Sequence, residues 1–186
     1  FGQVASQALL ARGTDVSIID SDVEMIQSAE GFGFKVYYGD GTRLDVLRAA
    51  GAGRVRLIAV CIDDRAAATR IVDLVNEQFP DTKLYVRSYD RAHTLELIKK
   101  GVTFELRETF ESALSFGRSA LEGLGVEQER AQAVEDDVRR RDLERLALQQ
   151  SGGLLAGVDI LLKKPRPEPL VVPARRARGI NPEAES

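Results

Sequence analysis

The stretch RVRLIAVCIDDRAAATRIVDLVNEQFP, residues 54–80, decides the fold. Residues 54–62 are almost continuously apolar, which predicts a strand buried on both faces in the centre of a sheet. Asp63 and Asp64 then begin a helical pattern, and Pro80 follows its end, as the helix dipole and helix-stop rules lead us to expect. A buried strand followed by a helix is typical of a parallel β-α-β sheet.

The same alternation continues on both sides of this stretch. Strands are expected over residues 15–20, 34–40, 83–90 and 102–106, and helices over residues 2–12, 22–31, 43–51, 63–79 and 90–101. Right-handed crossovers would join these elements into an α/β fold with a Rossmann-like, doubly wound parallel sheet over residues 1–106. The chain does not begin with Met, and its first helix has no strand before it. We therefore expect a truncated first strand and a longer parent protein.

The alternation stops after residue 106. Residues 107–150 predict two helices, broken by glycines at 123 and 125, and the second is highly charged with only a narrow apolar stripe. Such a helix is expected to lie across a partner rather than inside a core, so we interpret 107–150 as a dimerisation extension. Residues 151–186 are expected to form a flexible tail, which is rich in proline and charge from Pro165 onward and predicted to be disordered there.

Composition excludes several classes of protein. The chain has 186 residues, of which 44% are apolar, and a net charge of −3, so we expect a soluble globular domain with no nucleic-acid partner. It contains no apolar run long enough to cross a bilayer. The single cysteine, Cys61, excludes disulfides and is expected to be a small buried apolar residue. The single histidine, His93, provides no metal site and is expected at the surface or at a subunit contact.

Polar residues follow three of the expected strands, at the edge where parallel sheets bind ligands. They are Asp20, Ser21 and Asp22, then Gly39 and Asp40, then Asp63 and Asp64. Gly2 can be the third glycine of a dinucleotide-binding fingerprint, because Asp20 stands 18 positions later, where an acid contacts the ribose hydroxyls. The alternative for Gly2 is a simple packing role.

Asp40 lies in YYGDGTR, residues 37–43. Its carboxylate can accept a hydrogen bond from an adenine amino group, or Asp40 or Thr42 can cap the next helix. The sequence supplies neither a catalytic Ser, His and Asp set nor a convincing proton relay for a dehydrogenase. We therefore predict nucleotide binding without turnover and no enzyme activity.

Several motifs together carry a family resemblance: FGQ at 1–3, VYYGDGTRLDVLRAAGA at 36–52, AVCIDD at 59–64 and RETFESAL at 107–114. From residue 1 to about 145 the sequence resembles the cytoplasmic regulatory domain of the KefB and KefC type of glutathione-gated potassium efflux systems. More widely, it resembles the RCK (TrkA-N) domains of potassium channels and transporters.

The resemblance implies the C-terminal part of an antiporter that exchanges potassium for protons at the cytoplasmic face of the inner membrane. The N-terminal membrane antiporter domain would precede residue 1, and the helices after the sheet would form a homodimer. An ancillary flavin quinone-reductase-type subunit is a further partner that the resemblance suggests. In the family, glutathione holds the system closed and bulky glutathione adducts open it.

The resemblance also implies two sets of binding residues. A bound AMP or NAD(H) would be lined by Gly2, Asp20, Ser21, Asp22, Gly39, Asp40, Ile62, Asp63 and Arg87. A glutathione-type ligand would be lined by Gln3, Gln7, Phe32, Arg107 and Asp142. Gln7 and Asp142 stand where the family has an arginine and an asparagine, so we hypothesise weak glutathione binding or a preference for another thiol ligand.

Two other functions remain open from the sequence. One is a soluble Rossmann-fold NAD-dependent oxidoreductase. The other is a TrkA-like soluble subunit of a separate channel. An upstream series of apolar helices would favour the antiporter over both.

Overall fold

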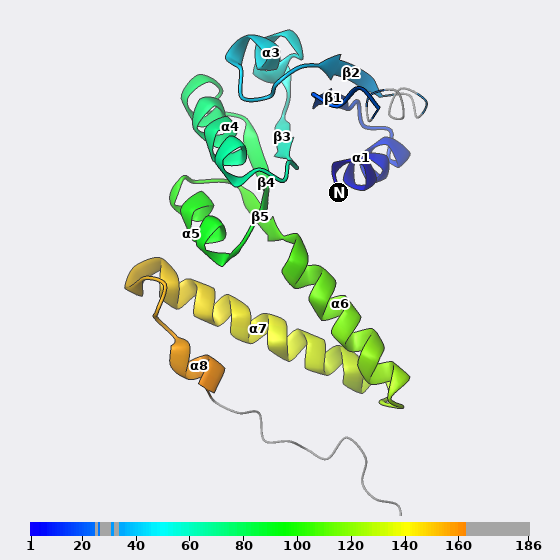
Figure 1. Ribbon diagram of the computed structural model, residues 1–186, viewed down its shortest axis with the longest axis vertical. Coiled ribbons are helices and arrows are strands. Elements are labelled where there is room, and N and C mark those ends of the chain that lie inside the picture. The colour runs from blue at the N-terminus through cyan, green and yellow to red at the C-terminus, as the bar shows by residue number, and fades with distance from the viewer. Residues whose placement is uncertain (25, 27–30, 32–33, 163–186) are drawn as a thin grey trace, which may run out of the picture. The chain divides into compact units, whose positions relative to one another are not determined.

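The computed structural model describes residues 1–24, 26, 31 and 34–162 (Figure 1). The chain divides into two compact units, Phe1–Phe116 and Gly117–Ser186, and each is described by itself. Within the described residues, no helix combines the length and the apolar character needed to cross a membrane.

Strands and helices alternate through the first unit, which confirms the predicted α/β, Rossmann-like fold. The strands are β1 (Ser17–Asp20), β2 (Lys35–Tyr38), β3 (Leu57–Val60), β4 (Lys83–Ser88) and β5 (Phe104–Arg107). The helices are α1 (Gly2–Ala11), α3 (Leu44–Ala49), α4 (Arg65–Gln78), α5 (Arg91–Lys99) and the start of α6 (Glu108–Gly123), with a 3-10 turn, η1, at Ala52–Arg54. The helix expected over residues 22–31 falls largely outside the described residues.

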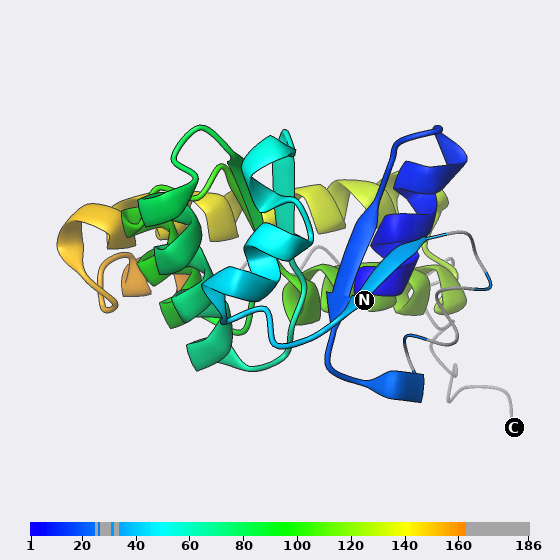
Figure 2. The ribbon, with the colours of Figure 1, turned by 90° about the horizontal axis from the view of Figure 1, so that it is seen from above.

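All strand pairs are parallel, and they form two separate sheets in the described part of the chain: β1 with β2, and β3 with β4 and β5. Seen from above, α1, β1 and β2 lie to one side of β3, α4 and α5 (Figure 2). The usual Rossmann order places the first strand between the second and the fourth, which correspond here to β1 and β3. The described residues do not supply that strand. In the described part of the chain β3 therefore has one neighbour, and β4 rather than the predicted β3 is the middle strand of its sheet.

The core of the first unit lies between α4 and the three-stranded sheet. Val72 and Val75 of α4 are 0% and 1% exposed, and Leu84 and Val86 of β4 are each 2% exposed. Ile19 of β1 packs against the same cluster, which ties the two-stranded sheet to this core.

The helices that follow β3 and β4 each begin at an aspartate that caps the helix. The Asp64 carboxylate accepts the amide of Ala67 at 2.7 Å at the start of α4. The Asp90 carboxylate accepts the amide of His93 at 2.7 Å at the start of α5. Each cap satisfies one of the backbone donors that a helix leaves unpaired in its first turn.

The second unit consists, in its described part, of the end of α6 followed by α7 (Gln128–Gly152) and α8 (Val158–Leu162). Gly125 has a φ of 85°, which permits the turn between α6 and α7. Arg118 of α6 hydrogen-bonds Gln132 and lies 3.6 Å from the carboxylate of Glu135 on α7.

Two helical segments extend beyond residue 150, where the sequence predicts that the tail begins. The helix α7 continues to Gly152, and α8 was not predicted. The buried Gln149 side chain donates to the carbonyl of Leu154, which closes the turn after α7. Residues 163–186, where disorder was predicted from Pro165 onward, lie outside the described residues.

Candidate functional site

The carboxyl ends of β1 and β2 bring together the first group of predicted residues. The amide of Gly39 donates to the carbonyl oxygen of Asp20 at 2.9 Å. The carboxylate of Asp20 accepts the amide of Asp22 at 3.0 Å, and that of Asp22 accepts the amide of Glu24 at 2.9 Å. Ser21 is exposed in the bend between them. The carboxylates of Asp20, which ends β1, and of Asp22, which follows it, thus lie at this edge, next to the turn after β2.

Asp40 is exposed in the turn that leads to α3. Its Oδ1 atom accepts the amide of Thr42 at 2.8 Å, and hydrogen bonds from the backbone and side chain of Thr42 hold the pKa of Asp40 below its ordinary value. The N-cap of α3 is Arg43, which has no side-chain capping bond. Neither Asp40 nor Thr42 therefore caps α3, and the capping alternative was wrong.

Gly39 and Gly2 both allow close packing. A Cβ atom on Gly39 would lie 2.9 Å from a Val46 methyl carbon of α3. A Cβ atom on Gly2 would lie 3.2 Å from the Cβ of Cys61, just beyond β3. Close approach of a helix to a strand is the role of the third glycine in the dinucleotide fingerprint, so the packing and fingerprint interpretations of Gly2 are compatible.

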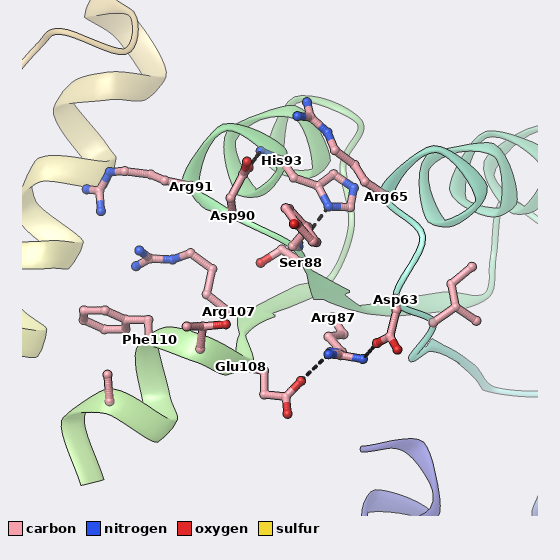
Figure 3. Close-up of a pocket in the computed structure, with 14 residues that line it drawn as sticks. Asp63, Arg65, Arg87, Ser88, Asp90, Arg91, His93, Arg107, Glu108 and Phe110 are labelled. Atoms are coloured by element: carbon pink, nitrogen blue, oxygen red, sulfur yellow. Dashed lines mark hydrogen bonds and ion pairs between the residues drawn. The ribbon is translucent and has the colours of Figure 1, made fainter. Parts of the chain in front are cut away.

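A cavity of about 670 Å³ opens at the carboxyl ends of β3, β4 and β5 (Figure 3). Its walls come from the segments that follow each strand and from the first two turns of α6. The lining residues are Ile62, Asp63, Arg65, Arg87, Ser88, Tyr89, Asp90, Arg91, His93, Arg107, Glu108, Thr109, Phe110 and Ala113.

The predicted residues therefore fall into two groups. Ile62, Asp63, Arg87 and Arg107 line the cavity, whereas Gly2, Asp20, Ser21, Asp22, Gly39 and Asp40 do not. On α1, Gln3 is half-buried and Gln7 is exposed, and both lie outside the cavity lining. Phe32 is outside the described residues, and Asp142 belongs to α7 in the second unit.

Arg87, at the end of β4, pairs with carboxylates from two other elements. One guanidinium nitrogen hydrogen-bonds Asp63, which follows β3. The other lies 2.5 Å from a carboxylate oxygen of Glu108, the first residue of α6, as an ion pair without hydrogen-bond alignment. The central carbon of the Arg87 guanidinium lies 5.4 Å from the centre of the Phe1 ring. Figure 3 shows Arg87 between Asp63 and Glu108.

Arg107 lies on the other side of Glu108, beside Phe110 (Figure 3). Its guanidinium carbon is 4.4 Å from the centre of the Phe110 ring, within cation–π range. Phe110 is three residues further along the chain, on the first turn of α6. The strand-to-helix junction thus fixes a cation at the wall of the cavity.

His93 is fully buried, so its prediction as a surface or subunit-contact residue was wrong. Its Nδ1 atom accepts the Tyr89 amide at 3.1 Å, which leaves the proton on Nε2, 3.2 Å from the Thr69 hydroxyl oxygen. Burial, with a smaller contribution from the Arg65 guanidinium, lowers the pKa of His93. The imidazole therefore serves as a neutral structural group in the cavity wall.

Cys61 is half-buried, and burial raises the pKa of its thiol. The described part of the chain contains no cluster of histidine, cysteine and acidic side chains that could hold a metal ion.

Sequence reasoning missed much of the cavity lining after β4. Ser88 ends that strand, and Tyr89, Asp90 and Arg91 follow it directly. The rule that found Asp20, Asp40 and Asp63, namely polar residues after a strand, would have found them too. Glu108 and Phe110 lie within the RETFE stretch, but no spacing argument predicted their contacts with Arg87 and Arg107.

Comparison with known proteins relates the chain to potassium-efflux proteins. Residues 1–105 match the model of the TrkA-N domain. A glutathione-regulated potassium-efflux system protein of Haemophilus influenzae is 41% identical over 185 residues, which are 100% of this chain and 30% of that protein. The efflux protein KefC of Enterobacter sp. (strain 638) is 40% identical over 144 residues, which are 77% of this chain and 23% of that protein. The chain thus spans less than a third of these relatives.

Two solved structures resemble this chain in fold. The Kef C-terminal domain of Shewanella denitrificans, solved in its AMP-bound form, is similar with a TM-score of 0.72 and 34% identity, over 81% of this chain and 92% of that one. The TrkA-N domain of the Escherichia coli inner membrane protein YbaL shares the fold, with a TM-score of 0.58 and 18% identity over 66% of this chain and 88% of that one. The chain therefore belongs to the TrkA-N domain family.

Proposed function

We propose that this chain is the ligand-sensing regulatory domain of a potassium:proton antiporter, and that a bound nucleotide and a second, anionic ligand set its state. One observation carries the proposal. Asp20 ends β1 and Asp40 follows β2, the adjacent parallel strand, and the Gly39 amide joins the two strand ends by its 2.9 Å bond to the Asp20 carbonyl, in a fold whose 34% identical relative was solved with AMP.

The nucleotide would lie along the carboxyl ends of β1 and β2. The N-terminus of α1 offers amide donors and a positive dipole end to a phosphate. Asp20 would accept the ribose hydroxyls and Asp40 the adenine amino group, and the lowered pKa of Asp40 keeps it ionised for that role. Ser21, Asp22, Ile62 and Asp63 remain proposed neighbours of an AMP or NAD(H) molecule.

The nucleotide would be held and not turned over. A hydride-transferring dehydrogenase needs a proton donor or relay near its substrate. The one histidine is 0% exposed and hydrogen-bonded through both ring nitrogens, so it is poorly suited to that task.

The second ligand would occupy the cavity at β3, β4 and β5. Its volume of about 670 Å³ is within the range of small-molecule sites. Arg107 can grip a carboxylate with two parallel hydrogen bonds, which suits a dianionic peptide such as glutathione. Gln3, Gln7, Phe32 and Asp142 remain the further residues that the family resemblance proposes for a glutathione-type ligand. Gln7 would supply no cation in place of the family's arginine, and Asp142 would supply no amide donor in place of its asparagine, so weak glutathione binding or another thiol ligand is expected.

The helical extension, proposed as residues 107–150, would form a homodimer. The exposed apolar side chains of α7 include Val134, Val138, Leu143 and Leu148, at 43%, 43%, 57% and 47% exposure. Covering such side chains is what makes a helix–helix interface favourable. Residues 1–106 would hold the nucleotide. The remaining residues, 151–186, include the described helix α8.

Gating would be a population shift between two arrangements of the dimer. The reduced ligand and a bulky adduct must prefer different arrangements, because a ligand with equal affinity for both shifts nothing. The membrane antiporter domain would precede residue 1 in the same chain, at the cytoplasmic face of the inner membrane, and an ancillary flavin quinone-reductase-type subunit remains a further proposed partner.

Potassium loss from cells tests this function. The complete protein would be produced in bacteria that lack their own efflux systems, and the cells would be treated with an electrophile that forms glutathione adducts. We expect potassium efflux that depends on the electrophile and on Arg107. Absence of efflux would contradict the antiporter assignment, and oxidation of NADH by the purified protein would favour an oxidoreductase.

A further inference from the structure

Arg87 joins three elements at the carboxyl edge of the larger sheet. It stands at the end of β4 and pairs with Asp63 after β3 and with Glu108 at the start of α6. The Arg87 side chain is 24% exposed, whereas that of Asp63 is 85% exposed. The pair with Glu108, 37% exposed, is the more sheltered of the two and is expected to be the stronger.

Glu108 directly follows Arg107, the last residue of β5. An ion pair that holds Glu108 therefore also restricts the backbone at the junction where Arg107 leaves the strand. The Arg107 guanidinium is held from the other direction by the Phe110 ring, at 4.4 Å. Arg107 is thus restricted by two contacts in the first turn of α6: the ion pair of the adjacent Glu108 with Arg87, and the ring of Phe110.

We propose that Arg87 is a positioning residue for the anion site of the cavity: through Glu108 it sets the strand-to-helix junction that aims Arg107 at the ligand. The proposal rests on the proposed anionic ligand. It assigns Arg87 an indirect role in place of the nucleotide contact that the family resemblance implies. The guanidinium of Arg87 already forms ion pairs with Asp63 and Glu108, which supports that reassignment.

The indirect and direct roles differ in the effect of Glu108→Gln. If Arg87 touches an anionic ligand itself, removing Glu108 frees the guanidinium and strengthens binding. If Arg87 acts through Glu108, the substitution loosens Arg107 and weakens binding. Loss of a negative charge alone would also favour an anion, so a control for charge is needed. Glu111→Gln removes an equal charge from the first turn of the same helix, outside the cavity lining.

Hydrogen–deuterium exchange of the purified protein tests the positioning without any ligand. Arg87→Gln and Glu108→Gln should each raise the exchange rate of the backbone amides of Ser112 and Ala113, which bond to the carbonyls of residues 108 and 109 in the first turn of α6, by about fivefold, which corresponds to about 1 kcal/mol for a partly sheltered pair. The double variant should exchange no faster than either single variant. Glu111→Gln should change the exchange rate of the same amides less than about twofold. Unchanged exchange in the Arg87 and Glu108 variants would overturn the proposal.

Calorimetric titration with glutathione and with AMP completes the test. Arg87→Gln and Glu108→Gln should each weaken glutathione binding by about fivefold relative to Glu111→Gln. The double variant should bind glutathione no more weakly than either single variant. AMP affinity should be unchanged in all of them. Tighter glutathione binding by Glu108→Gln, or weaker AMP binding by Arg87→Gln, would show direct contact and overturn the inference. If the wild-type protein binds no glutathione, the proposed ligand is wrong, and the exchange rates alone decide the role of Arg87.

Discussion

The amide of Gly39 donates to the carbonyl oxygen of Asp20 at 2.9 Å, one residue beyond the last paired residue of β2. This bond continues the ladder between β1 and β2 into the turn that carries Asp40. It therefore places Asp40 one residue away from a backbone contact with Asp20. The proposed nucleotide site depends on this geometry.

Asp40→Ala should weaken AMP or NAD binding about tenfold while leaving the sheet intact. A hydrogen bond to a charged group contributes about 1.5–3 kcal/mol, and part of that would be regained by water. Calorimetry would give the affinity, and circular dichroism would check the fold. Dimer stability should fall as well, because a ligand that binds the folded dimer stabilises it.

Asp45→Ala is the matched control, because Asp45 is an exposed carboxylate on α3 that pairs with Arg43. It should leave AMP affinity unchanged. If Asp40→Ala bound AMP as tightly as the wild type, the bond from the Thr42 amide would be the whole role of Asp40.

Gly39→Ala should destabilise the protein by about 1–3 kcal/mol through overpacking. The added Cβ atom would lie 2.9 Å from a Val46 methyl carbon. The double variant with Val46→Ala should recover part of that loss, because it removes the opposing methyl groups. Denaturant unfolding measures both.

Gly41→Ala controls for the general effect of alanine in this turn. Its Cβ atom would meet Ile71 at 3.4 Å, an ordinary contact distance. Equal losses of stability at positions 39 and 41 would argue that packing against Val46 does not explain Gly39.

His93 should make the protein less stable in mild acid. Burial lowers its pKa in the folded state, with Arg65 adding to the shift and Glu96 and Asp90 opposing it. Its neutral form is therefore favoured by folding. The contribution of neutral His93 to the free energy of unfolding is complete above the pKa of about 6.5 in the unfolded chain. It is lost as the pH falls toward the pKa in the folded protein, by up to about 1.4 kcal/mol per pH unit.

The free energy of unfolding at a pH of about 7.5 and about 5.5 would be compared for the wild type and His93→Gln. Glutamine can still accept the Tyr89 amide and donate to Thr69 without titrating in this range. The variant should lose less stability between the two pH values than the wild type does. An equal loss in both proteins would assign the acid sensitivity to other groups.

Phe110→Leu should weaken binding of an anionic peptide to the cavity by about two- to fivefold, because a cation–π contact contributes about 0.5–1 kcal/mol. Phe110→Tyr keeps the ring face under Arg107 and should bind nearly as the wild type does. Arg107→Lys should lose more than Phe110→Leu, since an ammonium cannot form the bidentate pair. Equal affinities for all four proteins would remove Arg107 from the ligand site.

The sequence predicted the alternation of elements well because each βα unit carries local signals. Asp64 and Asp90 start their helices as N-caps, and the apolar runs mark the strands. The lateral order of the strands is a different matter, because it depends on which strands pair. The apolar character of residues 57–60 predicts burial, but it does not show which strands pair with β3.

The site was predicted in part for a similar reason. Polar residues after strands are visible in the sequence, and Asp63, Arg87 and Arg107 all reach the cavity. Which of them pair is decided by side-chain geometry across β3, β4 and α6, which no spacing encodes. A lone histidine likewise gives no sign of burial, since its partners, Thr69 and Tyr89, come from separate elements.

Titration of the purified protein with AMP, followed by analysis of the recovered nucleotide, tests the central claim most directly. We predict saturable binding of one AMP per chain, weakened by Asp20→Asn, with the nucleotide recovered unchanged. A flat titration, or AMP converted to another product, would contradict the account of this chain as a nucleotide-holding regulatory domain.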